Sequence, residues 1–223
     1  MGGHSHGEVA AELALMTVKY YVDSSRDRFD VTWPFGYNFN ISLNENRLAT
    51  AIQLANRQVW KHSEQAPEFA GMGTTVVAAL VSEDKASIGS VGDSRAYLLR
   101  EGELKQLTVD DTWVGAMVQE GALDAKEVLH HPMRNVLTQA AGARETVEVR
   151  TLEHTLVGRD ILLLCSDGLY GVVEEAAIRS ILGAGDSLER AAARLIEAAR
   201  ANGASDNVSC ILLRYSGEPE SLS

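Results

Sequence analysis

The order in which helical and extended patterns follow one another restricts the fold most. Two stretches with helical spacing of apolar residues come first, at 7–22 and 44–64. Short β-branched or alternating runs follow: TTVVAALVS, KASIGSVG, SRAYLLRE and ELKQLT. Turn signals at Glu83-Asp84 and Glu101-Gly102 separate these runs. We interpret the four runs as strands of one antiparallel meander.

The second half returns to strands and then to helices. Residues 109–145 are polar and partly helical, and strands resume at TVEVRTLE and RDILLLCSD. Two helical patterns follow at 174–182 and 186–202, and Gly203 is a suitable terminator of the second. The strand NVSCILLRY comes last. Strands in runs and helices in runs indicate an α+β fold, with helices segregated onto the faces of sheets.

Both N-terminal patterns predict amphipathic helices. The apolar residues that share one face of the first are Val9, Leu13, Met16 and Tyr20. Those expected to face inward from the second are Leu48, Ile52, Ala55 and Val59. Asn44 is a candidate N-cap for the second helix. Between the helices, residues 23–43 carry aromatics, proline and glycine without periodicity, which predicts a long loop of unassigned role.

Charge and cysteine content exclude several classes of function. The chain has 223 residues and a net charge of −11, with no block of Lys or Arg to bind nucleic acid or an anionic membrane. No apolar stretch approaches the ~20 residues that span a bilayer. Cys165 and Cys210 both lie in apolar runs. They are expected to be buried thiols in strands, and two cysteines without a disulfide framework favour a reducing cytoplasm.

Three aspartates share one position, the exit of an apolar strand beside a small or turn-forming residue. They are Asp93 in SIGSVGDSRAYLL, Asp167 in ILLLCSDGLYG and Asp206 in GASDNVSCILL. Carboxylates that cluster at strand ends repel one another unless a cation or a proton intervenes. Hard divalent ions such as Mg²⁺ and Mn²⁺ take such oxygen ligands. Each aspartate alone is also explained by backbone hydrogen bonding in a turn, so only their joint occurrence predicts a metal site.

Other residues that could be functional give weaker evidence for a site. His4 and His6 lie near the terminus, and His130-His131 lacks Cys or His partners at zinc spacing, which favours a structural or loop role. Gly71-Met72-Gly73 precedes a strand and lacks a following lysine, so a phosphate-binding P-loop is excluded.

The sequence resembles a known family, the metal-dependent (type 2C) serine/threonine protein phosphatases in their bacterial form. GMGTTVVAALV matches the G-x-G-T-T strand entry, and VGDSRAYLLREGELKQLT matches the GDSR hairpin. HHPMRNVLTQAAGA resembles the H-P-x-R-N-V-L-T-R-A-L-G segment, with Gln139 in place of the usual Arg. LLLCSDGLYGVV and SDNVSCILL match two late aspartate motifs. Five motifs in order make this resemblance specific.

The resemblance implies two antiparallel sheets packed face to face with flanking helices, an αββα sandwich. It implies hydrolysis of phosphoserine and phosphothreonine in proteins by a water that two Mn²⁺ or Mg²⁺ ions activate, without a covalent intermediate. By motif position, Asp167 and Asp206 are expected to ligate the first ion, and Asp93 a third ion of bacterial members. Residues 109–145 resemble the flap beside the active site.

The chain also departs from the family pattern at its start. MGGHSHGEVAAELA resembles the segment that follows the family's first DG aspartate. The bridging aspartate and the arginine that grips phosphate therefore have no counterpart here, and no catalytic residue is assigned. We expect an N-terminally incomplete domain over 1–215, a polar tail over 216–223, and an internal methionine at Met1. The chain alone is expected to be weakly active or inactive.

Three hypotheses remain open at this stage. The first is a cytoplasmic phosphatase that acts on protein substrates of a serine/threonine kinase. The second is a non-catalytic pseudophosphatase that serves as a binding or regulatory module. The third, an unrelated α+β module, requires all five motifs to be coincidental.

Overall fold

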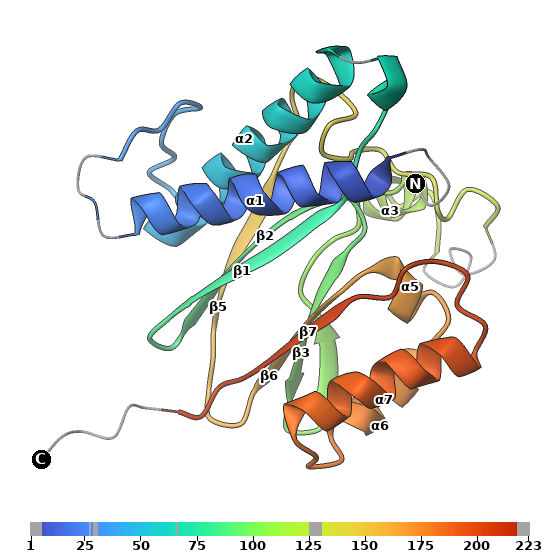
Figure 1. The fold of residues 1–223 in the computed structure, drawn as a ribbon. Helices are drawn as coiled ribbons and strands as arrows, with labels where there is room; N and C mark the ends of the chain where they lie inside the picture. The colour runs from blue at the N-terminus through green and yellow to red at the C-terminus, as the bar shows by residue number, and fades with distance from the viewer. Residues whose placement is uncertain (1–5, 27, 29–30, 66, 125–130, 218–223) are drawn as a thin grey trace, which may run out of the picture. The chain divides into compact units, whose positions relative to one another are not determined.

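The computed structural model describes the chain except for residues 1–5, 27, 29–30, 66, 125–130 and 218–223. The helices are α1 (Gly7–Ser25), α2 (Leu43–Gln65), the 3-10 helix η1 (Pro67–Phe69), α3 (Trp113–Gln119), α5 (Asp167–Tyr170), α6 (Glu175–Leu182) and α7 (Leu188–Ala201). The strands are β1 (Val76–Ser82), β2 (Lys85–Val91), β3 (Arg95–Arg100), β4 (Glu103–Gln106), β5 (Arg150–Thr155), β6 (Ile161–Cys165) and β7 (Cys210–Arg214) (Figure 1). None of the helices described is long and apolar enough to cross a membrane.

The strands form two sheets, with the orders β1-β2-β5 and β4-β3-β6-β7. The fold class expected from the sequence, α+β with two antiparallel sheets and flanking helices, is confirmed. The single meander is wrong, because β2 and β3 belong to different sheets. Between them Gly92 has φ +96°, and its missing side chain leaves room for Thr75, so the extended backbone is interrupted there.

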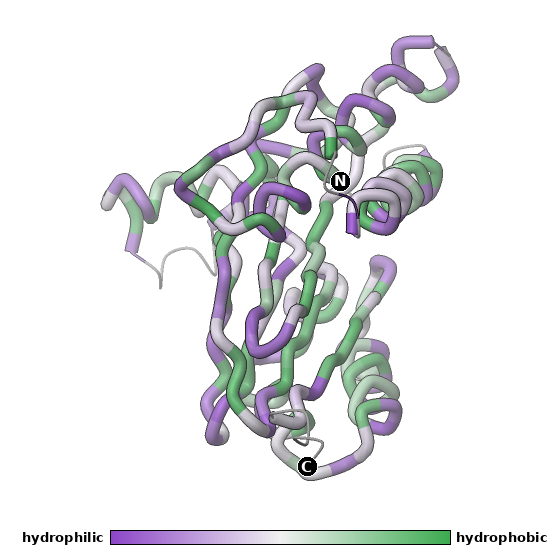
Figure 2. Tube along the Cα trace, turned by 90° about the vertical axis from the view of Figure 1, so that its left-hand side faces the viewer, coloured by the Kyte–Doolittle hydropathy of each residue, from purple (hydrophilic) through white to green (hydrophobic). Residues whose placement is uncertain are grey.

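The chain divides into two compact units, which are described one at a time. The first comprises 1–80, 87–93 and 110–153, and the second 81–86, 94–109 and 154–223. Extended stretches of the chain are largely hydrophobic, and hydrophilic residues gather at several turns (Figure 2).

In the first unit, α1 and α2 pack against each other (Figure 1). The inward face predicted for α2 is confirmed, because Leu48, Ile52, Ala55 and Val59 are all fully buried. The face predicted for α1 is wrong at two positions, since Met16 is 62% exposed and Tyr20 is 76% exposed. Small side chains explain the difference: α1 approaches its neighbours through Ala10 and Ala14, with Val9 and Leu13 at the margin.

The start of α2 also differs from expectation. Ser42, not Asn44, caps the helix: its Oγ accepts a hydrogen bond from the backbone N–H of Glu45, whose carboxylate accepts from the N–H of Ser42. This reciprocal pair is a capping box. The loop predicted over 23–43 is confirmed for the residues of 26–42 that the structure describes, whereas 23–25 belong to α1 and Leu43 begins α2.

In the second unit, α5, α6 and α7 cover one face of the β4-β3-β6-β7 sheet (Figure 1). Tyr97 and Leu163 of the sheet meet Ile178 of α6 and Leu195 of α7, all fully buried. Alternation places Leu98 on the opposite face, where it packs in a smaller cluster of the same unit. The sheet that supports the late aspartate motifs is thus buried on both faces.

An ion pair between a buried aspartate and a partly exposed arginine stabilises this unit. Arg100 donates to both carboxylate oxygens of Asp160, with Nε–Oδ1 at 3.0 Å and Nη2–Oδ2 at 2.6 Å. Burial raises the pKa of Asp160, but the hydrogen bonds from Arg100 and from the Val157 N–H outweigh it and hold that pKa below its usual value. The pair therefore contributes stability above the ordinary pKa of an aspartate.

We expect the free energy of unfolding to fall as the pH drops below about 4 and through the lowered pKa of Asp160. Arg100→Gln should weaken this acid dependence and cost about 1–2 kcal/mol at neutral pH, a modest value because the arginine is 34% exposed. Urea unfolding between about pH 3 and pH 7 measures both effects. An unchanged pH profile in the variant would contradict the assignment.

Candidate metal centre

The register of β6 and β7 brings two predicted ligands to one edge of the sheet. The strands pair from Ile161↔Arg214 to Cys165↔Cys210. Pairing continues one residue further, because the N–H of Ser166 donates to the carbonyl of Ser209 at 3.1 Å. Asp167 follows β6, and Asp206 precedes β7. Both aspartates therefore lie just beyond the same end of this strand pair.

Close backbone contact fixes these two segments side by side. The Oγ of Ser166 accepts from the N–H of Ser209 at 3.1 Å and donates to the carbonyl of Asn207 at 3.2 Å. Gly168 lies against that same carbonyl, and any side chain at this position would collide with it. A glycine is required here because two backbones approach each other closely.

The two carboxylates differ in exposure. Asp167 is half-buried and opens the short helix α5, with Ser166 as N-cap, while Asp206 is exposed. The Oδ1 of Asp206 accepts from the N–H of Asn207 at 2.7 Å. Within the part of the chain that the structure describes, neither carboxylate pairs with Lys or Arg or accepts from another side chain. Two acids beside one sheet edge thus lack a cationic partner among these residues.

This donor set suits a hard divalent cation in kind, because carboxylate oxygens are the ligands that Mg²⁺ and Mn²⁺ prefer. The set is small. Over the described residues, no three His, Cys, Asp or Glu side chains assemble into a metal-binding group. Asp167 and Asp206 would therefore hold such an ion together with other oxygen donors, such as water.

Arg95 and Tyr170 hold α5 against the sheet. The guanidinium of Arg95, on β3, lies over the ring of Tyr170 at 3.6 Å from its centroid. Its Nη1 also donates to the hydroxyl of Tyr97 at 2.7 Å. Since Tyr170 ends the helix that Asp167 begins, this cation–π contact helps to position the carboxylate.

Asp93 belongs to the first unit, in the turn that follows β2. It is half-buried. The residue before it, Gly92, donates its N–H to the Oδ2 of Asp111 at 3.0 Å and accepts at its carbonyl from the Asp111 N–H at 2.9 Å. Asp111 thereby clamps the turn that carries Asp93.

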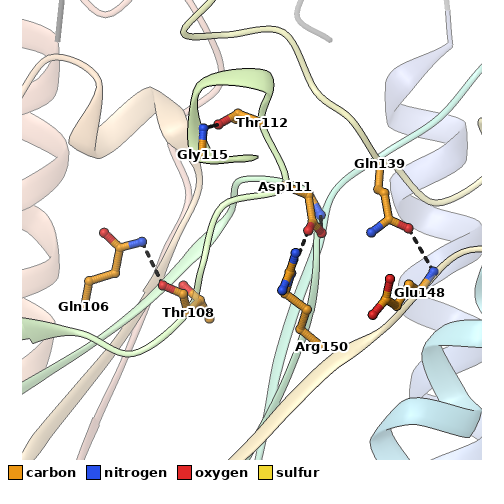
Figure 3. A network of polar contacts seen from close by, with 9 residues as sticks. Gln106, Thr108, Asp111, Thr112, Gly115, Gln139, Glu148 and Arg150 are labelled. Atoms are coloured by element: carbon orange, nitrogen blue, oxygen red, sulfur yellow. Dashed lines mark hydrogen bonds and ion pairs between the residues drawn. The ribbon is translucent and has the colours of Figure 1, made fainter. Parts of the chain in front are cut away.

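Asp111 is a residue that the sequence analysis did not single out. Its side chain is 1% exposed and pairs through Oδ1 with the Nε of Arg150 at 2.8 Å (Figure 3). Its carbonyl accepts from the N–H of Thr138 at 2.8 Å. The Asp111 carboxylate therefore joins the Gly92 turn to β5, and the Asp111 carbonyl joins the start of the segment 109–145 to Thr138 near its far end.

Residues 110–145 of the segment 109–145 belong to the first unit, and polar contacts order its start and its far end. Thr112 caps α3 by accepting from the N–H of Gly115, and Gln139 accepts from the N–H of Glu148 at 2.8 Å (Figure 3). His131 stacks on Trp113 with ring centroids 5.1 Å apart, which agrees with the structural role expected for it. His130, like His4, lies outside the described residues.

Comparison with known proteins decides to which family this chain belongs. The family model described as Protein phosphatase 2C matches residues 1–212. The chain belongs to the protein phosphatase 2C family. The resemblance read from the five motifs is thereby confirmed.

Individual phosphatases of this family support the assignment. The serine/threonine phosphatase stp of Listeria welshimeri is 35% identical over 213 residues, which cover 96% of this chain and 81% of the relative. The crystal structure of Stp1 from Staphylococcus aureus superposes with a TM-score of 0.84 at 33% identity, covering 97% of this chain and 81% of that one. The catalytic domain of PstP, solved in complex with two manganese ions, has a TM-score of 0.77 at 32% identity and covers 95% of this chain and 83% of that one.

By family, then, this chain is a metal-dependent serine/threonine protein phosphatase, and phosphoproteins are the class of partner that the family implies. The predicted enzyme class is confirmed at that level. The roles of the individual aspartates remain predictions.

Proposed function

We propose that this phosphatase 2C chain hydrolyses phosphoserine and phosphothreonine in proteins, and that Asp167 and Asp206 hold a Mn²⁺ or Mg²⁺ ion for that reaction. When bound, such an ion lowers the pKa of a water and neutralises charge on the phosphoryl oxygens. The supporting observation is the pair of carboxylates beside one sheet edge, with no cationic partner among the described residues.

Contacts within the chain hold the two aspartates in place at this edge of the sheet. The β6–β7 pairing and the contact of Gly168 with Asn207 hold the two aspartate segments at a fixed separation. The Asn207 N–H orients Asp206 by donating to one of its oxygens. Arg95, through Tyr170, steadies α5 and hence Asp167. Ligands carried on such supported positions need little rearrangement when an ion binds.

Asp93 is proposed as the ligand of an additional ion. Its support is the GDSR motif and the clamp that Asp111 places on the preceding glycine. Two to three ions are proposed for a complete domain; the PstP catalytic domain, solved with two manganese ions, is consistent with this number.

The domain bounds, the location and the source of the substrates are also proposals. We propose 1–215 as the phosphatase domain and 216–223 as a tail, a cytoplasmic location, and substrates phosphorylated by a serine/threonine kinase. We assign no catalytic residue beyond the ligands, because the family's bridging aspartate and phosphate-gripping arginine have no counterpart among these 223 residues.

Phosphate release from a phosphothreonine peptide tests the proposal. The 223-residue chain is assayed with Mn²⁺ and with EDTA, alone and fused behind the N-terminal segment of the Listeria relative. We expect weak turnover from the chain alone. The fusion should be faster with Mn²⁺ by at least about a hundredfold, since metal stabilisation is worth several kcal/mol.

Asp167→Asn in the fusion should return the rate to the EDTA level, whereas Glu197→Gln, which removes an exposed carboxylate from α7, should not. A fusion that folds and binds Mn²⁺ but releases no phosphate would instead favour the pseudophosphatase. The observation that favours the pseudophosphatase is that no three metal-ligating side chains group together among the described residues.

A further inference from the structure

The two cysteines of the chain lie directly opposite each other in the sheet. Cys165 ends β6 and Cys210 begins β7, and the register pairs them. Neither of them forms a disulfide in the structure. The sequence shows only two cysteines in separate apolar runs, 45 positions apart in numbering, so the pairing emerges only from the fold.

The hydrogen-bond pattern shows which kind of pair this is. The N–H of Ser166 donates to the carbonyl of Ser209, so the neighbouring pair 166↔209 is the hydrogen-bonded one. Antiparallel pairs alternate, and Cys165↔Cys210 is therefore a non-hydrogen-bonded pair. In such pairs the Cα atoms are about 4.5 Å apart, which lies within the range of about 4.4–6.8 Å that disulfides span.

Both thiols also face the same side of the sheet. Cys165 belongs to the hydrophobic cluster beneath α5, α6 and α7, and Cys210 packs against that cluster. The next pair on this face, Leu163↔Leu212, belongs to the same cluster. Cys165 is 3% exposed, whereas Cys210 is only half-buried, so the expectation of two fully buried thiols holds for the first alone.

We propose that Cys165 and Cys210 form a reversible oxidation site, at which a small peroxide converts the two thiols into an intramolecular disulfide. Cys210 is the more accessible thiol and is oxidised first. Its thiolate attacks one peroxide oxygen to give a sulfenic acid and a first water. Cys165 then attacks that sulfur, forming the S–S bond and releasing the second water. Two thiols lose two protons and two electrons, and one hydrogen peroxide becomes two waters.

Burial raises the pKa of the Cys210 thiol. Because the thiolate is the nucleophile, oxidation is expected to be slow at neutral pH and to accelerate as the pH rises toward that pKa. Peroxide is small enough to reach a half-buried sulfur at the edge of the strand pair. The site would thus respond to sustained exposure to an oxidant.

The bond would act on the proposed metal centre, a consequence that rests on the proposed function. Opposed Cβ atoms in a sheet lie about 4.5–5.5 Å apart, and a disulfide holds them at about 3.8 Å. In a non-hydrogen-bonded pair the Cβ atoms lie at the short end of this range, so the strand ends must approach by about 0.7 Å, whereas metal–ligand distances tolerate only about 0.2 Å. Asp167 lies two positions after Cys165, and Asp206 four before Cys210, so the disulfide should weaken Mn²⁺ binding by about tenfold.

Non-reducing peptide mapping tests the site directly. Trypsin places Cys165 in the peptide 160–179 and Cys210 in the peptide 201–214. After treatment of the intact chain with hydrogen peroxide, we expect these peptides joined, lighter by two hydrogens, in monomeric protein, and separated again by dithiothreitol. Peptides that stay separate, or that join only between two chains, would overturn the proposal.

Cys210→Ser, at the half-buried position, should fold and give no cross-linked peptide. Mn²⁺ affinity is then measured on the reduced and the oxidised protein. Binding by the reduced protein tests the metal centre, and the joined peptides test the disulfide, so the two can fail separately. Equal affinities of the reduced and oxidised proteins would overturn the link between the disulfide and the metal centre.

Discussion

Asp206→Asn and Asp167→Asn are each expected to weaken Mn²⁺ binding by more than about a hundredfold. Loss of a residue that merely supports a metal ligand costs about 10–100-fold in affinity, and a direct carboxylate ligand should cost more. An amide keeps the shape of the side chain but removes the charge that attracts a hard divalent ion. Titration calorimetry, or the electron paramagnetic resonance signal of free Mn²⁺, measures the loss.

The choice of variants distinguishes the loss of a metal ligand from misfolding. Asp206 is exposed, and among the described residues its Oδ1 accepts only from the neighbouring N–H, so its variant should unfold at nearly the wild-type temperature. Glu197→Gln removes one negative charge from the exposed face of α7 in the same unit and serves as the matched control. If this control weakened Mn²⁺ binding as much as Asp206→Asn, binding would follow overall charge and not the β6–β7 edge.

Asp111→Ala is expected to destabilise the first unit by about 2–4 kcal/mol. The variant deprives the buried N–H of Gly92 of its acceptor and leaves Arg150 without its partner. Arg150 is 39% exposed and can turn to solvent, which keeps the cost below that of a fully buried broken pair. Urea unfolding at neutral pH measures the loss.

Asp111→Asn provides the graded comparison, because it keeps an oxygen for the Gly92 N–H but loses the charge that faces Arg150. We expect its stability to lie between those of the wild type and the alanine variant. A wild-type unfolding free energy for Asp111→Ala would show that the network of Figure 3 contributes nothing to the fold.

Periodicity predicted the helices well where one face is plainly apolar. All four residues assigned to the inner face of α2 are buried. For α1 it failed at Met16 and Tyr20, because close helix packing selected the alanines on the adjacent strip. The spacing of large apolar residues does not indicate how closely α2 can approach α1.

The division of the strands between two sheets required tertiary information. Short connections usually join neighbours in one sheet, which favoured the meander. The turn at Gly92 breaks that rule through a positive φ and through the clamp from Asp111, which is distant in sequence. Gly92 could be noticed in the sequence, but nothing there indicates that Asp111 is its hydrogen-bond partner.

The candidate site shows the same limit. Asp167 and Asp206 were predicted as ligands from their motifs, and the register of β6 with β7 explains how positions about 40 residues apart come to one edge. Asp111 was missed because an acid in a polar segment has no local signature of burial. Its only sequence signal was its place in Asp110-Asp111-Thr112, ahead of a helix that Thr112 caps.

The central claim is that a divalent ion binds beside the common end of β6 and β7. Paramagnetic broadening of backbone amide signals by substoichiometric Mn²⁺ tests it most directly. We predict that the amides of 166–168 and 205–208 lose intensity first, and that Asp206→Asn restores them. Broadening that spares these residues and centres instead on the acidic side chains of α6 or α7 would contradict the account.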